Sequence, residues 1–201
     1  TDTGAVSRAA RDLLAASGIK AKEVSLAIPG SGIITPPLLP MPPMPRKEML
    51  EALRVEVESY AIPSDEEPVI DFQTIARKSG NANQQADVLL VIAPKGLIYS
   101  FVDTIQAANL KLVAIEIMPL ATMRTMTHGF GQGGGNGQPE LSANRPAMLV
   151  SIEENGGTIT VVQNGRNGYI QFIHRIEVGS IRLKSENGLR ELADELKTSL
   201  D

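Results

Sequence analysis

The sequence contains no cysteine and no tryptophan, and aromatic residues make up 3% of its 201 positions. Without cysteine, the chain has no disulfide, no thiolate metal site and no cysteine nucleophile. The scarcity of aromatic rings argues against a base-stacking nucleic-acid surface and against an aromatic sugar-binding cleft. Its histidines, His128 and His174, lie far apart without a His-x₃-His spacing. We therefore predict no metal site and assign no catalytic residue.

The remaining composition is that of an ordinary globular protein. The net charge is −4 with both signs interspersed, so nucleic acid is not expected as a partner. No apolar run approaches the roughly 18 residues that a membrane-spanning helix needs. Hydrophobic residues account for 42% of the chain, enough to fill a core. Because the chain opens and closes inside helical patterns, we expect it to be a piece of a larger protein.

Helical and strand patterns alternate along the first 117 residues. Prolines within 33–39 predict an edge or irregular strand, whereas the unbroken apolar run at 87–93 predicts a central one. From Ile33 to Ile117 the order is βαββαβ, which is typical of a ferredoxin-like unit. The predicted helices cover 5–17, 47–60 and 95–108, and the predicted strands cover 23–28, 33–39, 68–77, 87–93 and 111–117.

A second folding unit is predicted after a segment rich in glycine, asparagine and glutamine. A short helix over 118–127 leads into this segment, 129–145, which has the composition of a flexible linker. Ala147–Gly179 then reads as three strands joined by tight turns, and 186–200 is helical. The predicted units are therefore 1–32, 33–117, 118–145 and 146–201.

Three stretches carry a specific local pattern. Val24–Gly32 is a strand ending in Pro-Gly-Ser. Glu48–Ile75 holds a helix, an acidic run and an Asp-Phe-Gln strand. Val88–Pro119 holds an apolar strand, Ala-Pro-Lys, a helix and a strand that leads into Met-Pro. In this order the three stretches resemble the PilM family, the actin-like cytoplasmic proteins of type IV pilus assembly, which are related to the cell-division protein FtsA.

The resemblance implies an α/β (α+β) fold, a fragment of an actin-like ATPase with an inserted ferredoxin-like βαββαβ subdomain. Residues 1–32 would end the first actin-like subdomain and 146–201 would begin the second. It also implies a cytoplasmic protein, peripheral to the inner membrane, that binds the N-terminal tail of a PilN-like inner-membrane protein and other pilus assembly proteins. We expect the tail to pair with an exposed strand edge. The residues predicted to line its groove are Ile33, Thr35, Leu38 and Met41.

The same resemblance places a phosphate-binding hairpin in the second unit, with altered residues. The Asp-hydrophobic-Gly triplet of working ATPases falls on Ser151, Ile152 and Glu153. Glu153 and Glu154 would face a polyphosphate, and each like-charge pair at ~4 Å costs about 4 kcal/mol at an effective dielectric near 20. ATP and Mg²⁺ are therefore not expected in this chain, only in the full-length protein if at all. The residual cofactor-binding candidates are Ser151, Asn155, Gly156, Gly157, Thr158 and Gly179.

The residues leave alternatives open. Glu153–Gly157 also reads as a plain hairpin turn in which Asn155 and Gly156 supply positive φ angles. For the whole chain, an assembly scaffold with a degenerate nucleotide site competes with an active actin-like ATPase of the same machine. A ferredoxin-like regulatory or small-ligand-binding module is the third hypothesis.

Overall fold

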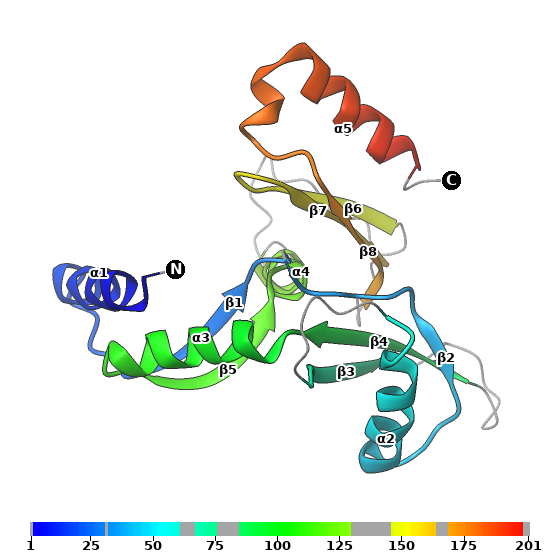
Figure 1. Ribbon diagram of the computed structural model, residues 1–201, viewed down its shortest axis with the longest axis horizontal. Coiled ribbons are helices and arrows are strands. Elements are labelled where there is room, and N and C mark those ends of the chain that lie inside the picture. The colour runs from blue at the N-terminus through cyan, green and yellow to red at the C-terminus, as the bar shows by residue number, and fades with distance from the viewer. Residues whose placement is uncertain are drawn as a thin grey trace.

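The computed structural model describes residues 2–30, 32–60, 67–75, 85–129, 146–163 and 169–198, with the side chains of 126–129, 163 and 169 left aside (Figure 1). Of the predicted linker over 129–145, Gly129 is the last residue of the helix before it, and 130–145 lie outside the described residues. The described strands form three small sheets, and the helices are distributed around them.

The first sheet pairs two strands that are far apart in sequence. Strands β1 (Glu23–Ile28) and β5 (Lys111–Ile117) run parallel, and helices α1 (Thr3–Ala16) and α3 (Lys95–Ala107) pack against each other beside them. Asp2 caps α1 by accepting a hydrogen bond from the Ala5 amide at 3.0 Å, as short polar side chains do at helix N-termini. These four elements confirm the predictions made from periodicity.

The second sheet is antiparallel, in the order β2 (Leu39–Met41), β4 (Ala86–Ala93), β3 (Val69–Ile75). The predicted central position of β4 and edge position of the proline-rich strand are confirmed. The edge strand is shorter than the predicted strand over 33–39 and begins further along the sequence, at Leu39. Residues 33–38 contribute a single bridge, between Ile34 and Ile92. Helix α2 (Arg46–Val57) covers one face. The core between them contains Met49, Leu53, Val57, Val88, Leu90 and Ile92.

The elements from β2 to β5 follow the predicted βαββαβ order, but the sheet differs from a ferredoxin-like one. In that unit the last strand lies beside the first, whereas here β5 pairs with β1 in a separate sheet. The physical reason is burial: Ile117 of β5 and Ile28 of β1 pack together with Ile33 and Ala93 in one apolar cluster. Among the described strands of 33–117, β2, β4 and β3 therefore form one sheet, whereas β5 pairs with β1 in the other.

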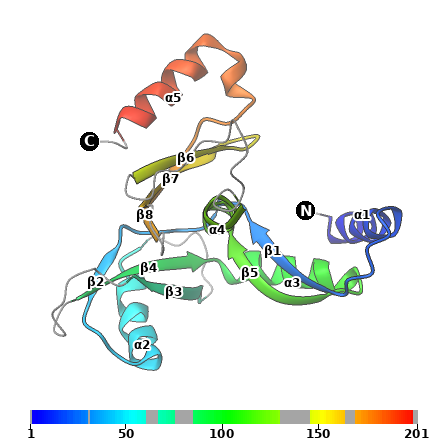
Figure 2. The ribbon, with the colours of Figure 1, turned by 180° about the vertical axis from the view of Figure 1, so that it is seen from behind.

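The third sheet is the predicted antiparallel meander. Strands β6 (Pro146–Ile152), β7 (Gly157–Gln163) and β8 (Tyr169–Ile176) are hydrogen-bonded in sequence order. A short 3₁₀ helix, η1 (Arg182–Lys184), then leads into α5 (Glu186–Thr198). Figures 1 and 2 show α5 above this sheet, on the side away from the other two sheets.

Helix α4 (Met118–Gly129) lies where the three sheets meet, and both opposite views show it there (Figures 1 and 2). It contacts β1 and β5 of the first sheet and β7 and β8 of the third. Leu120 of α4 and Ile173 of β8 belong to both apolar clusters that join the sheets. The packing around α4 therefore determines how the sheets are positioned relative to one another.

Candidate functional site

A groove of about 250 Å³ lies beside this junction, between the β2-β4-β3 sheet and the C-terminal end of β5. Along β4, Leu90 faces the core under α2, while Leu89 and Val91 face the groove. The groove lies over the face of the β2-β4-β3 sheet opposite α2, because Asp71 and Gln73 are register partners of Val91 and Leu89. Among the described strands, β3 and β5 are the outermost of their sheets. The residues that line it are Asp71, Phe72, Gln73, Leu89, Val91, Ile115, Glu116, Ile117 and Leu120.

Asp71 organises the β3 side of the groove. Its Oδ1 atom accepts a hydrogen bond from the Phe72 amide at 2.8 Å and forms an ion pair with Arg46 Nη2 at 2.6 Å. The Arg46 guanidinium also lies 4.8 Å from the centroid of the Phe72 ring, a cation–π contact. Arg46, the first residue of α2, therefore holds both groove residues in place.

Glu116 faces the groove from β5. Its Oε1 atom pairs with Arg124 on α4, and its side chain is 20% exposed, against 70% for Asp71. Neither Arg46 nor Arg124 is among the lining residues, so the lining holds two carboxylates and no cationic side chain. The groove therefore combines an apolar floor with a carboxylate on each side, and each carboxylate is paired with an arginine.

The predicted phosphate hairpin forms a turn of a different kind from the one expected. Neither Asn155 nor Gly156 has a positive φ, so the expected left-handed turn residues were wrong. Instead, the Glu153 amide donates to the Gly156 carbonyl at 2.8 Å. The turn takes this shape because a neighbouring segment packs against it and satisfies its carbonyls.

That segment begins at Gly179. A Cβ atom at this position would lie 2.3 Å from the Glu154 carbonyl oxygen, so only glycine fits. The Ser180 amide donates to the Glu153 carbonyl at 2.7 Å, and the Ile181 amide to the Glu154 carbonyl at 3.3 Å. These amides are therefore engaged by the protein itself rather than directed at a phosphate.

Of the remaining nucleotide candidates, the structure brings Ser151 and Thr158 together. They line a cavity of about 140 Å³ beside Pro119 at the start of α4, and Thr158 is 4% exposed. Gly157 contacts the same strand pair, since a Cβ there would lie 2.1 Å from the Ser151 carbonyl oxygen. This cavity is smaller than the pockets of about 300–1,000 Å³ that hold drug-sized ligands, so the described residues of this hairpin do not by themselves enclose a nucleoside triphosphate.

The residues predicted to bind a partner lie away from the groove. Ile33 is 8% exposed and belongs to the cluster around Ile28 and Ile117. Leu38 packs on the cluster that contains Leu89, and Met41 packs under α2. Thr35 is half-buried. Most of these side chains therefore pack into the core, and β2 is the part of the segment that forms an edge of its sheet.

In the part of the chain that the structure describes, no group of three or more His, Asp and Glu side chains is placed to hold a metal ion. Within the same residues, no helix has the length and apolarity that crossing a bilayer requires.

These observations define a mixed α/β protein in which the described strands form three small sheets around helix α4. A family model described as type IV pilus assembly protein PilM matches residues 1–172, so the chain belongs to the PilM family. A chain of the solved PilM-PilN type IV pilus biogenesis complex has the same fold, with a TM-score of 0.77 at 19% sequence identity. The alignment covers 100% of this chain and 62% of that chain, so this chain spans less than two thirds of its length. No curated protein sequence matches it.

Sequence reasoning missed the groove although the signal was present. Asp71–Gln73 lies at the end of the second stretch that resembles the PilM family, and Glu116–Pro119 ends the third. Most of these residues line one cavity. Their proximity was hidden because the ferredoxin-like interpretation placed β5 beside β2 instead of β1.

Proposed function

We propose that this chain is part of a PilM-type assembly scaffold whose groove docks the N-terminal tail of a PilN-like inner-membrane protein. One observation carries the proposal: parts of two PilM-like stretches, Asp71–Gln73 of β3 and Ile115–Ile117 of β5, come from different sheets and line the same groove. The related solved structure is a complex of PilM with PilN, which supports a partner of this kind.

The geometry suits an extended peptide. Val91 and Ile115 are half-buried and offer apolar surface to the peptide. Full burial of one aliphatic side chain of the peptide contributes about 1.5–3 kcal/mol. The edges of β3 and β5 provide backbone groups with which an added strand can form hydrogen bonds. A short tail would thus gain affinity from its backbone and selectivity from alternate side chains.

The test is a titration of the synthetic tail peptide against the chain and against two tryptophan variants. Gln73 is exposed and lines the groove, so Gln73→Trp should fill it and weaken binding at least tenfold. Its neighbour Thr74 is also exposed but does not line the groove, so Thr74→Trp is the matched control. Equal affinities for the two variants, or no binding by either this chain or the full-length protein, would count against the proposal.

The segment 33–41 is the second docking surface to test, because the sequence predicts that Ile33, Thr35, Leu38 and Met41 line the groove for the tail. Ile33 is too buried to vary without unfolding, so Thr35→Trp and Met41→Trp are the informative changes. If these abolish peptide binding while Gln73→Trp does not, the tail docks on the segment 33–41 and not in the groove.

The proposal includes a degenerate nucleotide site in the intact protein. The competing hypothesis is an active actin-like ATPase. The two carboxylates of Glu153 and Glu154 and the internally bonded amides around Gly179 favour degeneracy. An active ATPase predicts ATP·Mg²⁺ binding by the full-length protein that Ser151→Asp does not greatly strengthen. If Ser151→Asp creates binding where none existed, the natural sequence is not a working ATPase.

The finer architecture belongs to the same proposal. We assign 1–32 to the end of a first actin-like subdomain, the sheet of β2, β4 and β3 to the inserted subdomain, and 146–201 to the start of a second actin-like subdomain. The proposal places the protein in the cytoplasm beside the inner membrane, because it would bind the N-terminal tail of an inner-membrane protein there. Protease protection of the chain in spheroplasts but not in permeabilised cells is the expected result.

A further inference from the structure

We infer that the turn between α1 and β1, residues 17–22, binds the surface of an anionic lipid bilayer. The contact would be made by the side chain of Ile19 together with those of Lys20 and Lys22. This inference goes beyond the proposed function, because the ligand is a layer of lipid headgroups and the surface is separate from the groove.

The turn presents an exposed aliphatic side chain on an ordered backbone. Gly18 has a φ of 67°, and the amides of Gly18 and Ile19 donate to carbonyls in the last turn of α1 at 3.2 and 3.1 Å. This pair of hydrogen bonds is the Schellman arrangement that ends a helix at glycine. At the other end of the turn, the Lys111 amide donates to the Lys22 carbonyl at 2.7 Å. The backbone of Ile19 is therefore held in place, and yet Ile19 is 52% exposed.

The charge around Ile19 has the sign that an anionic surface attracts. Residues 8–22 contain four basic side chains and one acidic one, although the whole chain has a net charge of −4. Arg8, Lys20 and Lys22 are exposed, and no ion pair within the described part of the chain involves any of them. Each basic side chain that lies near an anionic bilayer raises the affinity about fivefold. The turn therefore combines an apolar side chain with unpaired positive charge, which are the two contributions that bind a protein surface to a bilayer.

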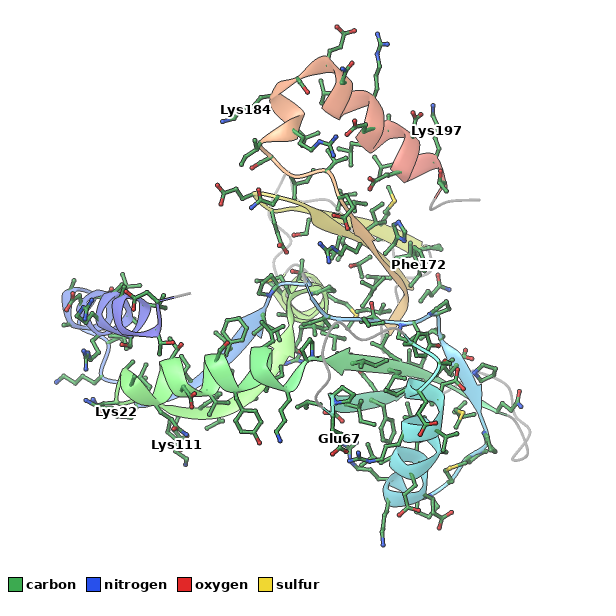
Figure 3. All side chains as sticks on the ribbon, in the orientation of Figure 1. Lys22, Glu67, Lys111, Phe172, Lys184 and Lys197 are labelled. Atoms are coloured by element: carbon green, nitrogen blue, oxygen red, sulfur yellow. The ribbon has the colours of Figure 1, made fainter. Side chains whose placement is uncertain are left out.

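The turn lies at an extremity of the molecule. Figure 3 shows Lys22 and Lys111 together there, at the start of the first sheet. Lys111 forms an ion pair with Glu23 at 2.6 Å, so this pair adds no net charge to the surface. The opposite views of Figures 1 and 2 both show the connection from α1 to β1 at the outer end of this sheet. A flat bilayer can therefore approach the turn without meeting the other two sheets.

The distance to the groove suits the proposed docking. Lys111 begins β5 and Ile115–Ile117 line the groove at its other end, so the two surfaces are separated by roughly 20 Å, the length of a strand of 7 residues. An extended tail of about six residues covers this distance. One lipid contact of this kind is weak and reversible, so stable attachment requires a second signal. Docking of the tail would provide that signal.

The test is sedimentation of the full-length protein and of this chain with vesicles of phosphatidylcholine, with and without phosphatidylglycerol. Both proteins should bind the vesicles that contain phosphatidylglycerol and not the neutral ones, and binding should weaken at high salt. Lys20→Gln and Lys22→Gln should each lower the partition coefficient about fivefold, and Ile19→Ser should lower it about tenfold. Melting curves establish that each variant is folded.

Two matched controls lie elsewhere on the molecule. Lys184 in η1 is exposed and has no ion pair among the described residues, and Figure 3 shows it beside α5, well away from Lys22. Val55 on α2 is 70% exposed. Lys184→Gln and Val55→Ser should leave the partition coefficient unchanged.

The outcomes separate this inference from the docking proposal. The inference is refuted if the full-length protein binds neither kind of vesicle or binds both equally. It is also refuted if Lys184→Gln lowers binding as much as Lys22→Gln, because the lipid would then respond to charge anywhere on the surface. None of these results bears on the groove, since the peptide titration contains no lipid.

Discussion

Replacing Gly179 by alanine tests whether this glycine serves the fold or a nucleotide. The new Cβ atom would lie 2.3 Å from the Glu154 carbonyl oxygen and 2.4 Å from the Gly156 nitrogen, both backbone atoms that cannot rotate away. The segment must therefore move, which breaks the hydrogen bonds from the Ser180 and Ile181 amides to the β6–β7 turn. Two such bonds are worth about 1–3 kcal/mol, and the displacement adds about 1–3 kcal/mol.

We expect Gly179→Ala to lower the free energy of unfolding by about 2–5 kcal/mol, seen as a fall of roughly 5–15 °C in the melting temperature. Urea denaturation followed by circular dichroism provides the free energy. Gly96 is the control, because a Cβ there meets nothing within 4 Å and the residue lies in the first turn of α3. Gly96→Ala should be neutral or stabilising by up to about 1 kcal/mol. If Gly179→Ala is as stable as Gly96→Ala, the structural role of this glycine is refuted.

Two other predictions concern α2 and its C-terminal end. Leu53 is 0% exposed in the core between α2 and the β2-β4-β3 sheet, so Leu53→Ala should cost about 2–5 kcal/mol in urea denaturation. Val55→Ala on the same helix, 70% exposed, should change stability by less than about 0.5 kcal/mol; similar losses for both would contradict the assigned face. Burial, with a smaller contribution from Glu56, raises the pKa of Tyr60, so the neutral phenol stabilises the folded state below its ordinary pKa of about 10. This stability should be lost as pH rises through the folded pKa, and Tyr60→Phe should lose less stability than the natural chain between pH 9 and 11; parallel stability curves would disprove it.

Local patterns in the sequence were sufficient for most elements and for some of their positions. The unbroken apolar run of β4 predicted a central strand because both of its faces are buried. The spacing of Met49, Leu53 and Val57 predicted the buried stripe of α2, and all three are in the core. The meander was predicted from strands separated by turn residues, and Pro94 marked the start of α3.

The same patterns failed where an outcome depended on distant residues. The choice of β1 rather than β2 as the neighbour of β5 rests on the cluster of Ile28, Ile33, Ala93 and Ile117. The conformation at Asn155 and Gly156 was mispredicted because the turn is shaped by Gly179, more than twenty residues later, and not by its own sequence.

The sequence by itself determined the class of fold, the family and the order of helices and strands, because these depend on periodicity, turn residues and short stretches of local resemblance. Only the tertiary structure decided which strands pair across the first sheet and which residues of the two PilM-like stretches border one groove. The physical reason is that a strand's own side chains specify which face is buried, whereas its neighbour is chosen by apolar contacts with residues far away in the chain. The proximity of Asp71 and Glu116 in the groove lining is a consequence of that choice.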